Sequence, residues 1–598
     1  MARRRAIAAN GVLMLLACLS ACQQQQPSTT APATPPAPLN ASTEPASPLS
    51  VSLSVDRYGK GDSTTTRKRE RGQGAVRFTD VAREMGVSFR YDTGRSSRRL
   101  MVEATGGGAG WVDFDRDGWC DLFFCQGGDP AAADLSTQPT DRLFRSLGGT
   151  RFVDVTVPAT LIEQQYGQGV AVADYDEDGF DDILVTNVGP ESLFRNLGDG
   201  TFEERAAAAG VGSRRWSSSA AWGDLDGDGD LDLYLCNYLD YDPRNPLLCL
   251  SSTGEPGTCH PEEVPPSLSE CYFNQGDGRF TEEAGERGLT GSATKALGVI
   301  ITDFDGDGRP DVFVANDTTA NHFFANRGEG RFEEVAGQVG CATNALGQYQ
   351  ANMGMAFGDY DHSGTPDVYI THFTDDSDTL FRNLGAAGFE DVTRREGLHE
   401  PTLPYLGFGA VMADYDCNGE QDIFVANGHI DDWREVNGDP WHMPSLLFSY
   451  DGVGRWHDRT ADAGPYLKLP RLGRAVASAD FDADGDLDLA VVNQDDDVAI
   501  LRNDSSRGHW LKVRLLGRHS NRSAIGAKVT VKASDRSYVQ HLAGGTSYCS
   551  AHQPLLAFGL AEHSGPVDLR IVWPDGGIEE RSGVAVDGEV VLVESREG

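Results

Sequence analysis

The stretch GDLDGDGDLDLYLCN, residues 223–237, carries five aspartates at alternate positions and then runs into an apolar segment. At neutral pH these carboxylates repel one another, and a tight turn alone does not require them. A hard divalent cation such as Ca²⁺ takes about six to eight oxygen ligands and offsets their charge. The stretch therefore predicts a cation site on a loop that leads into a strand.

The same nine-residue loop occurs seven times, with the template D-Φ-D-x-(D/N/S)-G-x-x-D. Side chains at positions one, three and five converge when the backbone coils tightly, and glycine at position six provides a positive φ. Position twelve is an apolar strand residue and not the glutamate of an EF-hand, which excludes that motif. The predicted ligands are Asp113, Asp115, Asp117 and Asp121 in loop one; Asp174, Asp176, Asp178 and Asp182 in loop two; Asp224, Asp226, Asp228 and Asp232 in loop three; Asp303, Asp305, Asp307 and Asp311 in loop four; Asp359, Asp361, Ser363 and Asp367 in loop five; Asp414, Asp416, Asn418 and Asp422 in loop six; and Asp480, Asp482, Asp484 and Asp488 in loop seven.

The segments around each loop indicate the elements that position it. A Gly/Ala-rich segment precedes the loop, a short apolar strand follows it, and a hairpin such as SLFRNLGDGTFEE (192–204) usually comes next. Four short antiparallel strands per unit, with small residues nearest a common axis, are typical of a propeller blade. We therefore predict an all-β fold with a seven-bladed β-propeller over residues 74–505. The seventh unit lacks its outer strand, and residues 74–82 (GAVRFTDVA) are expected to supply it and close the ring.

With these motifs in view, the repeats resemble the FG-GAP/VCBS units of integrin-α-like propellers, whose Asp loops bind calcium. Three segments, 521–531 (NRSAIGAKVTV), 544–560 and 567–577, resemble the ASPIC/UnbV domain. That domain follows such repeats in the cartilage-acidic-protein family and its bacterial relatives. The resemblance implies up to seven bound Ca²⁺ ions and a small C-terminal β-domain over residues 506–598.

Two loops depart from the pattern, because Ser363 and Asn418 replace aspartate at position five and should weaken their sites. The alternative is a set of Asp-rich turns without metal. It is disfavoured because the clustered carboxylates would then repel one another strongly.

The N-terminus resembles an export signal. Arg3 to Arg5 precede the apolar run GVLMLLACLS, and the ending LSAC resembles a bacterial lipobox with Cys22 as the lipidated residue. An ordinary signal peptide with a chance cysteine is the alternative. Residues 1–22 are thus predicted to be a signal peptide and residues 23–73, rich in Gln, Pro, Ser and Thr, a flexible tether. We expect an exported lipoprotein, periplasmic or on the cell surface, whose only membrane contact is the lipid.

A long insertion, residues 238–272, interrupts the third unit and contains Cys249 and Cys259. In an exported protein a Cys249–Cys259 disulfide is expected, with free buried thiols as the alternative. Cys120 and Cys125 are too far apart along an extended strand to pair. His429, in a connection of the sixth unit, belongs either to a polar loop or to a binding rim.

Composition and motifs narrow the function. The formal net charge of −39 argues against nucleic-acid binding. No nucleophile elbow, phosphate loop or dinucleotide fingerprint is present. The favoured hypothesis is a surface-tethered, calcium-binding propeller that binds an extracellular protein or glycan. The alternative is a calcium-dependent enzyme, a lyase or hydrolase acting on extracellular polysaccharide, which would need convergent polar residues in the axial mouth.

Overall fold

The computed structural model describes residues 76–251, 254–432, 434 and 438–595. The predicted signal peptide, Cys22 and the tether over residues 23–73 therefore lie outside the described residues. In the described part of the chain, no helix is both long and apolar enough to cross a membrane.

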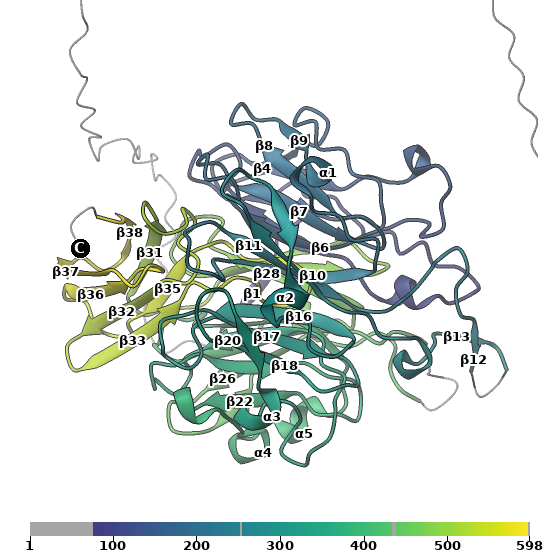
Figure 1. The fold of residues 1–598 in the computed structure, drawn as a ribbon. Helices are drawn as coiled ribbons and strands as arrows, with labels where there is room; N and C mark the ends of the chain where they lie inside the picture. Colours follow the sequence, from purple (N-terminus) through teal and green to yellow (C-terminus); the bar gives the residue numbers. More distant parts are fainter. Residues whose placement is uncertain (1–75, 252–253, 433, 435–437, 596–598) are drawn as a thin grey trace, which may run out of the picture. The chain divides into compact units, whose positions relative to one another are not determined.

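Seven antiparallel sheets follow one another along the chain, which confirms the seven-bladed propeller (Figure 1). Each has four propeller strands, named here from the innermost to the outermost. The blades are β2 (Ala109–Val112), β3 (Asp121–Phe124), β4 (Arg142–Ser146) and β5 (Phe152–Asp154); β6 (Gly167–Ala173), β7 (Asp182–Asn187), β8 (Ser192–Asn196) and β9 (Phe202–Glu204); β10 (Ser217–Gly223), β11 (Asp232–Asn237), β14 (Glu270–Asn274) and β15 (Phe280–Glu282); β16 (Ala296–Thr302), β17 (Asp311–Asn316), β18 (His322–Asn326) and β19 (Phe332–Glu334); β20 (Met355–Gly358), β21 (Asp367–Ile370), β22 (Thr379–Asn383) and β23 (Phe389–Asp391); β24 (Gly407–Ala413), β25 (Asp422–Asn427), β26 (Leu446–Tyr450) and β27 (Trp456–Asp458); and β28 (Gly473–Ala479), β29 (Asp488–Asn493), β30 (Ala499–Asn503) and β1 (Phe78–Asp80).

The innermost strands are rich in glycine and alanine because they touch one another around the axis. A Cβ added to Gly169 in β6 would lie 2.6 Å from the carbonyl oxygen of Ser218 in β10. A Cβ added to Gly354, just before β20, would lie 2.1 Å from the carbonyl oxygen of Phe408 in β24. Any larger residue would push neighbouring blades apart.

The ring is closed by the N-terminal strand, as predicted. β1 pairs with β30 in a register that places Phe78 opposite Asn503. The Phe78 ring is fully buried, with its edge against Tyr415 and Phe424 at centroid distances of 5.2 and 6.0 Å. Residues from the two ends of the repeat array therefore share one blade, which covers the edge of β30 and completes the four strands.

Short helices join the elements. They are α1 (Ala206–Ala209), α2 (Ala284–Arg287), α3 (Ala336–Val339), α4 (Thr393–Glu396) and α5 (His399–Thr402), with 3₁₀ turns η1 (Met101–Ala104), η2 (Leu135–Thr137), η3 (Pro261–Glu263), η4 (Gly385–Ala387) and η5 (Tyr466–Lys468). Helices α1 to α4 each end at a glycine with positive φ. They were not predicted, because a single helical turn has no periodicity of its own.

The insertion in the third blade forms a small hairpin of β12 (Cys249–Leu250) and β13 (Pro256–Gly257). A disulfide joins Cys249 and Cys259, the pair expected from the sequence, with their Cα atoms 5.1 Å apart. Cys120 and Cys125 are buried and unpaired.

The C-terminal segment folds into two small sheets. One has the order β35 (Leu556–Gly559), β31 (Trp510–Leu516), β38 (Gly588–Val593); the other has the order β33 (Arg536–His541), β32 (Lys528–Ala533), β36 (Val567–Val572), β37 (Ile578–Val584). Their facing apolar side chains, with Trp573 among them, form a separate core. The segment WPDGG (573–577) forms the turn between β36 and β37.

The C-terminal domain also sends residues 543–553, here called the axial arch, to the innermost strands of the propeller. Gly544 exchanges two backbone hydrogen bonds with Ile301, and Ser547 exchanges two with Met355. Within the arch, β34 (Ser550–Ala551) adds a parallel strand to β2. The Gln553 N–H donates to the Ser478 carbonyl in β28.

The remaining three blades also contact the arch. Val170 of β6 donates to the Cys549 carbonyl at 3.2 Å, and the Cys549 N–H donates to Ser219 Oγ of β10 at 3.1 Å. The ring of Tyr548 lies 5.2 Å from that of Phe408 in β24. One segment thus touches the innermost strand of every blade, so it lies on the propeller axis. The sequence analysis did not predict this, because the arch copies no part of the repeat.

Candidate metal loops

The carboxylates predicted to share a cation do converge. Ligand oxygens of positions one, three and nine lie within 4.8 Å of one another in the sets Asp113–Asp115–Asp121, Asp174–Asp176–Asp182, Asp224–Asp226–Asp232 and Asp303–Asp305–Asp311. Each position-nine aspartate is the first residue of a blade's second strand. The sheet therefore holds one ligand, while the loop carries the others back toward it.

Backbone hydrogen bonds build each loop. The position-one carboxylate accepts the N–H of the position-six glycine at 2.7–3.1 Å in all seven loops. The position-nine carboxylate accepts the N–H of position two at 2.8–3.2 Å. Position four also has a positive φ, for example 58° at Glu177, which the sequence template did not show because most residues there are not glycine.

Several of these oxygens are buried without any hydrogen-bond partner: Oδ1 of Asp113, Asp115, Asp174, Asp176 and Asp226. A buried carboxylate oxygen without a partner is costly, because its lost hydration is not replaced. A cation among the ligand set would supply that missing interaction. The donor set is oxygen only, which suits a hard cation.

The pKa values of the loop carboxyls also indicate that a cation belongs in these loops. Burial, together with the charges of Asp115 and Asp113, raises the pKa of Asp121 to about 9. Burial, with the charges of Asp305 and Asp303, raises the pKa of Asp311 to about 8. A carboxyl with such a pKa is protonated at neutral pH unless positive charge is provided nearby. A bound cation would therefore stabilise the carboxylates of these loops in their charged form.

Arginines of the third strands provide part of that charge. Arg145 in β4 contacts Asp115 and Asp117, and Arg195 in β8 contacts Asp176 and Asp178. They bind Oδ2 of these aspartates, which leaves Oδ1 of Asp115 and Asp176 directed elsewhere. The arginines therefore complement a cation site without filling it.

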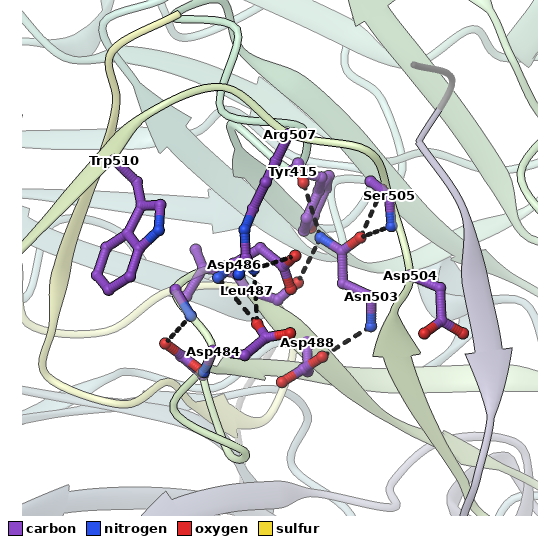
Figure 2. Close-up of polar contacts among 12 residues, drawn as sticks. Tyr415, Asp484, Asp486, Leu487, Asp488, Asn503, Asp504, Ser505, Arg507 and Trp510 are labelled. Carbon is purple, nitrogen blue, oxygen red and sulfur yellow. Dashed lines mark hydrogen bonds and ion pairs between the residues drawn. The ribbon is translucent and has the colours of Figure 1, made fainter. Parts of the chain in front are cut away.

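An asparagine that was not among the predicted site residues links neighbouring loops. Asn503, at the end of β30, donates its backbone N–H to Asp488 of loop seven at 2.7 Å. Its amide nitrogen donates to the carbonyls of Leu487 in loop seven and Tyr415 in loop six, as Figure 2 shows. Equivalent residues in other blades are Asn196, Asn274, Asn326 and Asn383. The Asn that recurs before the hairpin turn, or at the end of the third strand, in five of the seven blades was the available signal.

Loop seven differs from the others in the described part of the chain, because a buried lysine of the C-terminal segment binds its position-one aspartate. Lys512 Nζ lies 2.6 Å from Asp480 Oδ2. Arg507 Nη1 lies 2.8 Å from Asp484 Oδ1 and 2.7 Å from Asp486 Oδ2, as Figure 2 shows. Burial alone would lower the pKa of Lys512, but the charges of Asp480 and Glu589 outweigh it and the pKa is raised. The amine is therefore charged.

The C-terminal domain also reaches three other loops with basic residues. Arg522 Nε lies 3.6 Å from Asp174 Oδ2, Lys528 donates to the carbonyl of Gly364 at 2.7 Å, and Arg536 pairs with Glu420. A basic domain surface thus faces the acidic loops. The sequence analysis assigned no role to this domain.

The connection that contains His429 has both buried and exposed residues, Arg434 and His442 being exposed. His429 and Asp431 are buried. Asp431 accepts a hydrogen bond from Arg99 at 3.0 Å and from the N–H of Thr258 at 2.8 Å. It therefore ties blade six to the N-terminal segment and to the blade-three insertion.

Comparisons with known proteins agree with the repeat assignment. A model described as FG-GAP-like repeat matches residues 113–185, 178–235, 264–314, 303–370 and 359–425, and a model described as ASPIC and UnbV matches residues 517–598. Cartilage acidic protein 1 of Xenopus tropicalis is 24% identical over 326 residues, which is 52% of this chain and 45% of that protein. The human protein is 24% identical over 312 residues, or 50% of this chain and 43% of its own length. The chain thus spans about half the length of these relatives.

Among solved structures, a lectin of Agrocybe aegerita that recognises terminal N-acetylglucosamine is 17% identical, with 59% of this chain and 79% of the lectin covered and a TM-score of 0.35. YCF48 bound to D1 peptide is 8% identical, with 70% and 96% covered and a TM-score of 0.37. Rhamnogalacturonan lyase YesW is 12% identical, with 66% and 89% covered and a TM-score of 0.27. On its repeats and its C-terminal domain, the chain belongs to the family of proteins in which an FG-GAP-like propeller is followed by an ASPIC/UnbV domain.

Proposed function

We propose that this chain is an exported, lipid-anchored propeller that binds Ca²⁺ in its blade loops and presents a binding surface to an extracellular protein or glycan. The observation that carries the calcium assignment is the set of buried, unpartnered carboxylate oxygens in loops one to three. Seven- or eight-coordinate oxygen sites with flexible geometry suit Ca²⁺, whereas Mg²⁺ demands tighter octahedral geometry and retains water. In this role Ca²⁺ stabilises the blades and takes part in no reaction.

The occupied axis favours a binding module over an enzyme. The polysaccharide lyase or hydrolase considered from the sequence needs an accessible cluster of polar residues at the axial mouth. The axial arch lies there instead and bonds to the innermost strands. The cavity of about 180 Å³ beside the arch is lined largely by apolar residues such as Trp222, Phe357 and Met412.

The blade-three insertion offers a surface for a protein ligand. Leu247, Leu248 and Leu250 are 48%, 58% and 70% exposed, and the Cys249–Cys259 disulfide lies among them. Exposed leucines grouped on a constrained loop are typical of a protein-binding site rather than of ordinary surface. We therefore place the ligand contact on this insertion.

Thermal melting tests the calcium assignment. The mature chain should melt at a clearly higher temperature in Ca²⁺ than in excess chelator, and Mg²⁺ should restore little of the difference. Asp226→Asn should reduce the gain, whereas Asp199→Asn, on an exposed hairpin, should not. Identical melting curves with Ca²⁺ and with chelator would refute the proposal.

Arrays of extracellular proteins and glycans, probed with and without chelator, test the binding role. Binding to a protein should be lost in the double variant Leu248→Ser, Leu250→Ser, with an unchanged melting temperature. Leu469→Ser, at another exposed leucine, is the matched control. Binding that survives the double variant would move the contact away from the insertion.

Retention of the protein in the membrane fraction, and its loss on Cys22→Ser, tests the lipid anchor.

A further inference from the structure

We propose that loop seven binds no Ca²⁺, because Lys512 and Arg507 provide its positive charge, and that this loop serves as the socket that fixes the C-terminal domain to the propeller. The inference rests on the proposed calcium function of the other six loops. The sequence of loop seven matches the calcium template, but its positive charge comes from basic side chains of the same chain.

Lys512 binds the position-one carboxylate at Oδ2, the oxygen that also accepts the Gly485 N–H, and supplies a positive charge there. Its Nζ is 2.6 Å from Asp480 Oδ2, and the two side chains are 5% and 0% exposed. Within the described part of the chain, the only other position-one carboxylate with a basic side chain inside 4 Å is Asp174, where Arg522 is 37% exposed and 3.6 Å away. A buried, charge-assisted contact of this kind is among the strongest polar interactions in proteins.

Arg507 engages position five. Its Nη1 bridges Asp484 Oδ1 and Asp486 Oδ2, and the Asp486 side chain is fully buried. In loops one and two the partner arginine binds Oδ2 of position five and leaves Oδ1 to a backbone N–H. In loop seven the arginine binds Oδ1 of Asp484, which also accepts the Asp486 N–H at 3.4 Å, and the same arginine neutralises the buried Asp486.

Trp510 covers the loop from outside. A Cβ added to Gly485, the position-six glycine, would lie 2.1 Å from the indole of Trp510. Lys512, Arg507 and Trp510 lie within one short stretch at the start of the C-terminal domain. A divalent cation entering loop seven would meet two positive charges, and its repulsion by the buried Lys512 amine would be poorly screened.

Calcium stoichiometry in single-site variants tests the proposal. Equilibrium dialysis of the full mature chain against saturating Ca²⁺, with metal counted by mass spectrometry, should give the same number of ions for the wild type and for Asp480→Asn. The matched variant of loop three, Asp224→Asn, should lose one ion. A loss of one ion in Asp480→Asn as well would overturn the proposal.

Two further outcomes keep the test decisive. If Asp480→Asn does not fold, the wild-type count decides: six ions support the proposal and seven contradict it. The double variant Lys512→Met, Arg507→Met should bind one ion more than the wild type, and an unchanged count in the folded double variant counts against the proposal. Absence of Ca²⁺ from the wild type would instead refute the underlying calcium function, which is a distinguishable result.

Discussion

Loop three and loop seven have nearly the same sequence, DLDGDGDLD and DFDADGDLD, but different surroundings. Asp224 of loop three accepts three backbone N–H groups and contacts no basic side chain among the described residues. Asp480 of loop seven accepts two backbone N–H groups and the amine of Lys512. The motif thus specifies the backbone coil and the carboxylates, whereas residues of another domain decide which cation meets them.

Removal of calcium should give the largest effect. A ligand at a hundredfold excess over its Kd contributes about 2.7 kcal/mol per independent site to the free energy of unfolding. The increase in the free energy of unfolding on adding Ca²⁺ should be smaller in Asp224→Asn than in the wild type and unchanged in Asp480→Asn. The Asp480→Asn variant should be less stable than the wild type by the same amount with and without Ca²⁺. Chemical unfolding in Ca²⁺ and in chelator measures both gains. A reduced gain in Asp480→Asn would remove the distinction between the two loops.

Strand β1, which completes the blade of loop seven, should contribute as much to the free energy of unfolding as an outer strand within the repeats. Phe78 in β1 and Phe280 in β15 occupy the same outer-strand position in the blades of loops seven and three. Truncation of a buried phenylalanine costs about 3–5 kcal/mol. Phe78→Ala and Phe280→Ala should therefore lower the free energy of unfolding by similar amounts in urea titrations. A cost below about 1 kcal/mol for Phe78→Ala alone would show that β1 is not an integral strand.

This closure could be predicted from the sequence and the axial arch could not, for one physical reason. The segment GAVRFTDVA repeats the outer-strand pattern of the other units, so the sequence predicts that it supplies the missing outer strand of the seventh unit. Residues 543–553 use backbone hydrogen bonds to strands whose glycines leave space for any chain. Such contacts impose little side-chain pattern. The carboxylate ligands were similarly predictable from spacing, whereas Lys512 and Arg507 carry no motif that points to loop seven.

Loss of the asparagine that links neighbouring loops should lower the free energy of unfolding by less than loss of Phe78 or Phe280. Asn274→Ala would leave the buried carbonyls of Tyr175 and Leu231 without donors, and Asn503→Ala would do the same for Tyr415 and Leu487. Each should cost about 1–3 kcal/mol. Asn274→Ala should weaken calcium binding at two loops, but Asn503→Ala at loop six only. Calorimetric titration distinguishes these outcomes, and two weakened sites in Asn503→Ala would contradict the account of loop seven.

Acid should destabilise the fold through His541, which is buried near loop three. His541 lines a cavity of about 150 Å³ together with Asp224 of loop three and Lys528. Burial, followed by the charge of Lys528, lowers the pKa of His541 to about 3. Below the ordinary pKa of 6.5 the unfolded chain binds a proton that the folded chain does not, so stability falls as the pH drops from 6.5 toward 3.

One pH unit below 6.5 this contribution is about 1 kcal/mol. His541→Gln should flatten the pH dependence of the melting temperature in saturating Ca²⁺, and His519→Gln, at an exposed histidine, should not. Equal pH dependence in the wild type and His541→Gln would show that this histidine does not sense acid.

Anomalous diffraction from crystals of the mature chain, grown in Ca²⁺ and measured at a long wavelength, tests the central claim most directly. The account predicts anomalous peaks within the carboxylates of loops one to six and the ammonium group of Lys512 at Asp480 in loop seven. A calcium peak in loop seven, or no peak in any loop, would contradict it.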